Sequence, residues 1–276
     1  MRSIGVLALA ALSLLLPAVS VIGHEGLHEL IDAQKKKVEK APSDPALRFE
    51  LGSLYGSHGD LELALKNLER VDALAPGKFP TDLVRSQAYL VVSDFAKAKE
   101  ALDRQLASHP ENPRGWLLRA RAEQHLGQDK ASLADFREAL KRTPSPEPDL
   151  IQEVSDALAK QGFQEEAAAV LAAGIERLGR IPSLVLRSVD LAISTRNFDA
   201  ALRLIDETQK DAPRPEPWMA RRATILREAG RIEESRAAWK ALAAHLAALP
   251  ERERASHAMT QLADEALKAL EPDQPR

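Results

Sequence analysis

The amino-acid sequence predicts an all-α protein, a right-handed superhelical solenoid of helix–turn–helix repeats with a capping helix at each end. The first observation is a recurrence, because Gly52, Ser86 and Ala120 follow one another at intervals of 34 residues and are all small. The second is that each period contains two runs of apolar residues at helical spacing, separated by a turn. The third is the composition, which is 45% hydrophobic but only 4% aromatic, as expected for helices packed at close range.

The segment from Pro113 to Pro144 shows one repeat most clearly. We expect a first helix over residues 114–126, ended by Gly127 in a left-handed conformation. A second helix is expected over residues 130–142, with Phe136 on its apolar stripe. Pro144 then prevents continuation, because proline lacks an amide proton and disfavours a helical residue before it.

These landmarks resemble the tetratricopeptide repeat, a helix pair of 34 residues. Trp116, Ala120, Gly127, Phe136 and Pro144 carry the resemblance in this repeat, and related residue types recur before and after it. The resemblance implies that neighbouring pairs stack and bury one another's apolar faces. One added residue near Pro146 shifts the phase of the later repeats by one position.

The resulting organisation has five parts. The sequence predicts a signal peptide in residues 1–23 and an amino-terminal capping helix in residues 24–44. Repeats one to three follow in residues 45–146, and repeats four to six in residues 147–249. Residues 250–276 form a carboxy-terminal capping helix, expected over residues 251–270, and a tail.

The first 23 residues have the pattern of a secretory signal. Arg2 gives a positive start, residues 4–16 form an apolar run too short for a comfortable bilayer span, and cleavage is expected after Ser20 or Gly23. Export to the periplasm or the exterior follows, with no membrane span after cleavage. An uncleaved amino-terminal anchor is the alternative. The chain has no cysteine, so disulfides, thiolate sites and lipoprotein attachment are excluded.

In the family that the sequence resembles, the first helices of the repeats line a concave face that binds a protein or peptide. When the family's ligand-facing positions are transferred repeat by repeat to this chain, they give a basic band followed by an acidic band. Arg114 and Arg121 of the basic band are seven residues apart and therefore lie on one helix face. The charges either bind a partner segment or pair with residues of the next repeat. The expected partner-binding residues are Phe49, Leu83, Gln87, Arg114, Leu117, Arg121, Gln124, His125, Gln152 and Asp156.

Some relatives hold a chaperone's terminal carboxylates with a clamp of Lys, Asn, Asn, Lys and Arg. This chain keeps a comparable charge only at Arg114, so the resemblance does not extend to that clamp. The formal net charge of −3 gives no sign of nucleic-acid binding.

One string has the form of a zinc-protease motif, His24-Glu25-Gly26-Leu27-His28. It lies next to the expected cleavage site, and nothing after it supplies a third ligand or a catalytic domain. We therefore expect no enzyme activity and no cofactor. The string is either a coincidence or a weak copper, nickel or zinc site formed by His24 and His28.

The sequence thus predicts a non-enzymatic protein-interaction scaffold or assembly adaptor that binds a partner segment in its groove. One alternative is a metal-handling protein whose amino-terminal histidine pair is attached to the repeat array. A helper subunit of an envelope enzyme complex is another alternative.

Overall fold

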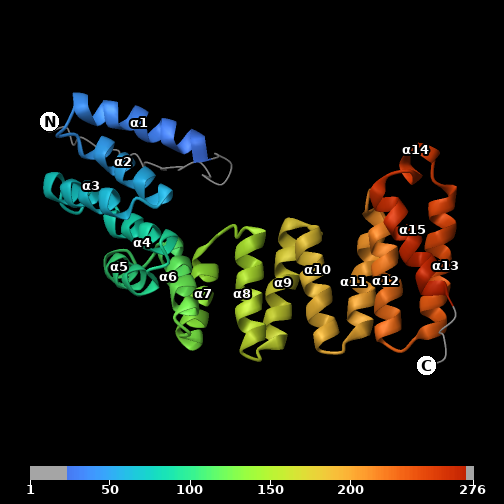
Figure 1. Cartoon of the computed structure of the whole chain (residues 1–276). Helices are drawn as coiled ribbons and strands as arrows, with labels where there is room; N and C mark the ends of the chain where they lie inside the picture. Colours follow the sequence, from blue (N-terminus) through green and yellow to red (C-terminus); the bar gives the residue numbers. More distant parts are fainter. Residues whose placement is uncertain (1–23, 272–276) are drawn as a thin grey trace, which may run out of the picture. The chain divides into compact units, whose positions relative to one another are not determined.

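The computed structural model describes residues 24–271, and these residues contain fifteen helices and no strand (Figure 1). The chain divides into two compact units, residues 1–126 and 127–276. The predicted signal peptide and the last five residues of the predicted tail lie outside the described residues. The prediction of an all-α solenoid of helix pairs is confirmed.

The first unit contains a leading helix and the helices of the first repeats. In chain order they are α1 (His24–Lys40), α2 (Pro45–His58), α3 (Leu61–Leu74), α4 (Thr81–Val91), α5 (Phe95–Ser108) and α6 (Pro113–His125).

The second unit contains the remaining helices, of which α8 to α13 run alternately in opposite directions in Figure 1. They are α7 (Asp129–Arg142), α8 (Pro148–Lys160), α9 (Gln164–Leu178), α10 (Pro182–Ser194), α11 (Phe198–Asp211), α12 (Glu216–Glu228), α13 (Ile232–Ala248), α14 (Glu251–Arg254) and α15 (His257–Leu270).

Helix starts follow from local chemistry. Proline opens α2, α6, α8 and α10, where its missing amide proton is no loss. The Asp44 carboxylate accepts hydrogen bonds from the amides of Ala46 (2.8 Å) and Leu47 (3.2 Å), and Asn112 accepts one from the amide of Arg114 (3.0 Å). These side chains satisfy amide groups that the first turn of a helix leaves without a partner.

Each core cluster joins one helix pair to the next. In the first unit, Phe49 of α2 packs with Leu68 and Val71 of α3 and with Val84 of α4. In the second, a cluster extends over α10, α11 and α12 and includes Val185, Ile205 and Ile225.

Small residues lie where two helices approach each other most closely. A Cβ on Gly52 would lie 3.1 Å from Cγ of Leu68, so any larger residue there would press on the second helix.

The leading helix α1 lies against the first repeat. Leu27, Ile31 and Val38 are buried in one cluster with Leu51 and Tyr55 of α2. Nε2 of Gln34 donates a 3.0 Å hydrogen bond to the carbonyl of Leu47. The apolar stripe of α1 therefore covers the side of α2 that no earlier repeat covers.

The turn between the two helices of every repeat uses one left-handed residue at the same position. Gly127 was expected there, and its φ of 72° confirms this. Two repeats place a residue with a side chain in this conformation, which costs about 1–2 kcal/mol relative to a right-handed one. The six residues and their φ values are Gly59 (95°), Ser93 (61°), Gly127 (72°), Gly162 (86°), Arg196 (57°) and Gly230 (77°).

The prediction of one continuous carboxy-terminal helix is wrong. The short helix α14 ends at Arg254, and α15 begins at His257. Ser256 is extended between them, with φ −67° and ψ 145°. The four residues of α14 are Glu-Arg-Glu-Arg and none is buried, so no packing holds them in line with α15. The second helix does pack, through Met259 and Ala266, against Leu242 and Leu246.

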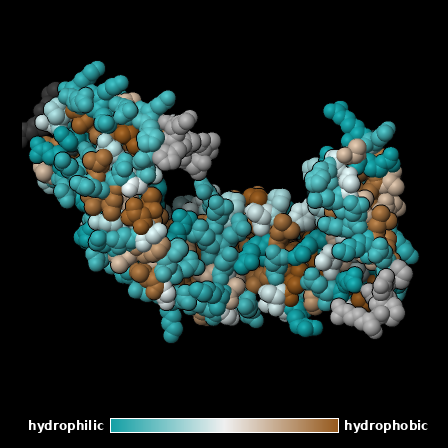
Figure 2. Space-filling view, viewed as in Figure 1, coloured by the Kyte–Doolittle hydropathy of each residue, from teal (hydrophilic) through white to brown (hydrophobic). Residues whose placement is uncertain are grey.

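Hydrophilic residues cover most of the visible face of each unit, with smaller hydrophobic clusters between them (Figure 2). In residues 24–271 no helix has both the length and the apolar character needed to cross a bilayer.

Replacement of Ser93 by glycine should relieve the strained turn of the second repeat. We expect Ser93→Gly to raise the free energy of unfolding by about 0.5–1 kcal/mol, after allowance for the greater entropy of glycine in the unfolded chain. Urea denaturation followed by circular dichroism measures the change. The matched control is Gly162→Ala, which meets no atom within 4 Å and should lower stability by about 1 kcal/mol. Equal effects of the two variants would contradict this account.

Candidate functional site

A pocket of about 310 Å³ lies in the first unit, between the first helices of repeats two and three. Gln87 and Leu90 of α4 form one side, and Leu118, Arg121 and His125 of α6 form the other. Phe95, the first residue of α5, completes the lining. The two helices lie side by side, and Gln87 and Arg121 occupy equivalent repeat positions, so the stacking itself brings them to one pocket.

Arg114 lies beside this pocket, on the same helix as Arg121. The surrounding protein, and then the positive charge of Arg121, lower the pKa of Arg114 from its usual value. Among residues 24–271 no carboxylate lies within 4 Å of the Arg114 guanidinium. Its side-chain contact is with Gln87, whose amide oxygen can accept from Nε of Arg114 at 3.2 Å and from a terminal nitrogen. A neutral amide satisfies the guanidinium protons but does not balance the charge.

The other side of the pocket is apolar. The rings of Phe95 and His125 are stacked, with centroids 4.1 Å apart and planes within 3° of parallel. Leu90 and Leu118 lie beside them, and Leu118 is buried. The pocket therefore combines an apolar surface with a few polar groups, as ligand pockets generally do.

The structure brings together part of the predicted partner-binding set. Gln87, Arg121 and His125 line the pocket, and Arg114 contacts it through Gln87. Three further predicted residues lie on the same two helices without lining the pocket. These are Leu83 and Leu117, which are half-buried, and Gln124, which is exposed.

Phe49 does not lie on an open surface. Its side chain is 5% exposed and packs on Leu68, Val71 and Val84. The ring of Phe79 lies beside it, with ring centroids 5.2 Å apart. Burial of a large aromatic ring stabilises the fold more than exposure would, so we assign Phe49 to packing and not to the site.

Gln152 and Asp156 belong to the second unit. Asp156 pairs with Arg187 of the next repeat, and one repeat further on Asp190 pairs with Arg221 at 2.5 Å. Gln152 lies 3.4 Å from the hydroxyl of Ser183. For Asp156 and Asp190, the structure therefore shows pairing with the next repeat, which was one of the two readings open from the sequence.

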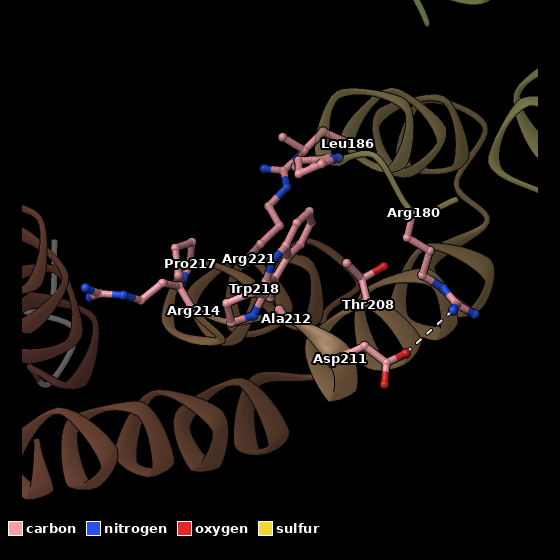
Figure 3. Close-up of a pocket in the computed structure, with 11 residues that line it drawn as sticks. Arg180, Leu186, Thr208, Asp211, Ala212, Arg214, Pro217, Trp218 and Arg221 are labelled. Carbon is pink, nitrogen blue, oxygen red and sulfur yellow. Dashed lines mark ion pairs between the residues drawn. The ribbon is translucent and has the colours of Figure 1, made fainter. Parts of the chain in front are cut away.

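A larger pocket, with a volume of about 780 Å³, lies in the second unit and was not expected from the sequence (Figure 3). Trp218 and Leu186 give it an apolar surface, and in this view Arg180 and Arg214 lie on opposite sides of Trp218. Arg180 is paired with Asp211 at 3.8 Å, whereas among residues 24–271 no carboxylate lies within 4 Å of Arg214. The available signal was a run of prolines, at positions 213 and 215 in the connection from α11 to α12 and at position 217 in the first turn of α12.

The amino-terminal histidine string is described only in part, because the side chains of His24 and Glu25 lie outside the described set. Leu27 of the string is buried in the core, and His28 is exposed. Among the described residues no group of three or more histidine, aspartate, glutamate or cysteine side chains could hold a metal ion.

The fold and its repeated contacts define a class, the all-α proteins built from stacked helix pairs. Residues 83–145, which include Gln87, Arg114, Arg121 and His125, match the sequence model of the tetratricopeptide repeat. This segment of the chain is therefore a tetratricopeptide repeat region. A comparison with curated proteins found no match.

Solved structures share the fold at low sequence identity. YrrB, described as a tetratricopeptide repeat protein with an unusual peptide-binding site, is 20% identical, with a TM-score of 0.52 over 66% of this chain and 94% of its own. A tetratricopeptide repeat protein from Parabacteroides merdae is 16% identical, with a TM-score of 0.50 over 88% of this chain and 93% of its own. The structure of Naa15/Naa10 bound to HypK is 14% identical in sequence, with a TM-score of 0.52 over 88% of this chain and 39% of that one.

The pairing of Asp156 with Arg187 can be measured with a double-mutant cycle. Asp156→Asn and Arg187→Gln, singly and together, should give a coupling of about 0.2–1 kcal/mol in urea denaturation that decreases as salt is added. The control cycle combines Asp149→Asn, on the same helix α8, with Arg187→Gln. A coupling of equal size in both cycles would show that the ion pair is not formed in solution.

Proposed function

We propose that this chain is a non-enzymatic interaction scaffold that binds a partner peptide at the pocket between α4 and α6. The peptide supplies a carboxylate to Arg114 and Arg121 and an adjacent apolar side chain to the surface formed by Leu90, Phe95 and Leu118. Tetratricopeptide repeat proteins are interaction scaffolds, and this proposal adds a location and a ligand chemistry.

The observation that carries the proposal is geometric: the guanidinium of Arg114 contacts only the neutral amide of Gln87, a residue that lines the pocket together with Arg121. Partial desolvation and a second guanidinium both disfavour the positive charge of Arg114, and no carboxylate of the described chain lies within reach to compensate. A partner carboxylate at this position would receive forked hydrogen bonds and would relieve the repulsion between the two arginines. Gln87 would remain as a neutral neighbour that satisfies the protons of Arg114 not used by the ligand.

The apolar half of the pocket supports the same ligand class. The stacked rings of Phe95 and His125 give the pocket a flat aromatic surface, and the buried residue Leu118 also lines it. Apolar burial provides affinity, whereas the arginines fix the orientation of the peptide. The two requirements together predict acidic and apolar residues next to each other in the ligand.

Selection from a random peptide library tests the ligand chemistry without knowledge of the partner. Purified chain should enrich peptides with Asp or Glu beside Leu, Ile or Phe. Fluorescence anisotropy with one labelled selected peptide should then show affinity reduced about 10- to 100-fold by Arg114→Gln, the range expected for loss of a charge-assisted hydrogen bond. Arg121→Glu should weaken binding at least as much, because it replaces attraction by repulsion.

The matched control is Arg104→Gln, which removes one positive charge from α5, where Arg104 pairs with Asp82 outside the pocket. It should leave affinity unchanged, and circular dichroism should show the same helicity in all variants. Selected peptides without acidic residues, or equal binding by the wild type and Arg121→Glu, would remove this pocket as the site.

We also propose that the chain works outside the cytoplasm, on the basis of the signal-like pattern in residues 1–23. Expression in a bacterial host with a periplasm, followed by intact-mass analysis of the periplasmic fraction, should yield a protein that begins at Val21 or His24. A mass that retains Met1 would support the anchor alternative instead.

A further inference from the structure

Three side chains from the leading helix and the first repeat meet at one point of the first unit. Nε2 of His28 on α1 lies 3.3 Å from Nε2 of His58, the last residue of α2. Nδ1 of His58 lies 2.9 Å from a carboxylate oxygen of Asp60. The side chain of His58 is 14% exposed, whereas His28 is an exposed residue, so the pair lies at the surface with its His58 side buried.

The contact with Asp60 fixes the tautomer of His58. A carboxylate only accepts hydrogen bonds, so the neutral His58 ring carries its proton on Nδ1 and keeps a lone pair on Nε2. His28 is then the donor in the contact between the two Nε2 atoms. A carboxylate behind a histidine in this manner is the usual outer-shell arrangement of metal-binding histidines, because it orients the ring and makes it a stronger ligand.

The distance between the two nitrogens suits a shared metal ion. A zinc ion bound at about 2.0–2.1 Å to each of two nitrogens in tetrahedral geometry holds those nitrogens about 3.3 Å apart. The His28 and His58 rings meet at 63° with centroids 4.4 Å apart, so one ring must turn to direct both lone pairs to a common point. His28 can make this rotation because it is exposed.

We propose that His28 and His58 bind a divalent transition-metal ion, Zn²⁺, Ni²⁺ or Cu²⁺, through their Nε2 atoms, with Asp60 as the outer-shell partner of His58. Imidazole favours these ions, whereas Mg²⁺ and Ca²⁺ require oxygen ligands. The inference goes beyond the proposed peptide binding and is independent of the pocket between α4 and α6. It differs from the His24–His28 pair expected from the sequence, because the second ligand comes from another helix.

The local fields are compatible with a cation. His58 ends α2, where the last carbonyls favour positive charge, and Asp60 adds a negative charge directly behind it. His28 lies one turn inside the start of α1, where the opposing field of an amino-terminal helix end has already weakened. When the ion binds, the neutral His28 ring moves its proton from Nε2 to Nδ1 through solvent. An imidazolium form of either ring would release one proton.

The proposed role of the metal is to fasten the leading helix to the first repeat. The ion joins α1 to the carboxy-terminal end of α2, beside the buried contacts of Leu27 and Ile31 with Tyr55. A ligand that binds only when both helices are in place stabilises the folded form by mass action.

Isothermal titration calorimetry of the full-length, metal-free chain with ZnCl₂ and NiCl₂ tests the site. We expect one equivalent to bind the wild type, and we expect His28→Ala to lose at least tenfold in affinity. Asp60→Asn should weaken binding by about 10- to 100-fold, as other outer-shell substitutions do. Saturating Zn²⁺ should raise the melting temperature of the wild type and not that of His28→Ala, and MgCl₂ should have no effect on either.

The control variant is His257→Ala, which removes a histidine at the start of α15 and should leave binding unchanged. Because His28 is exposed, its alanine variant should fold as the wild type does, and His58→Ala is interpreted only at equal helicity. Zn²⁺ affinity that is retained in His28→Ala would overturn the site. Affinity retained in His58→Ala but lost in His24→Ala would overturn it in favour of a pair within α1. Neither result would affect the peptide assay with Arg114→Gln.

Discussion

A helix pair of this chain leaves one apolar face uncovered, and the first helix of the next pair covers it. Phe49, Leu68 and Val84 come from three successive helices and share one cluster, and Val185, Ile205 and Ile225 do the same in the second unit. Because this burial is the main favourable term, the first helices of neighbouring repeats within each unit must lie side by side at a fixed offset. The contact between Arg114 and Gln87 is a result of that offset, as is the pocket that they adjoin.

The repeat pattern was readable from the sequence because one requirement recurs at one spacing. Small residues such as Ala120, a left-handed turn such as Gly127 and a proline at helix starts each report a local constraint on the backbone. The break before His257 was not readable in this way. The Glu-Arg-Glu-Arg segment before it has good helix propensity, and only the absence of a packing partner decides against a continuous helix.

The lining of the candidate pocket was predictable where repeat position alone sets the direction of a side chain, as for Gln87, Arg121 and His125. The direction of a side chain was not predictable where packing against residues of other helices determines it. Phe49 turns into the core because Leu68 and Val84 surround it. The same limit applies to His28, since its contact His58 is thirty residues away in the sequence and is reached only through the packing of α1 on α2.

The ion pairs of Asp156 with Arg187 and of Asp190 with Arg221 repeat at the interval of the helix pairs themselves. Excision of one complete interval, from Arg187 up to the residue before Arg221, would therefore place Arg221 opposite Asp156 and recreate the lost contact. This series of contacts does not depend on the number of helix pairs, so duplication or loss of a whole pair would leave each remaining aspartate of the series opposite an arginine.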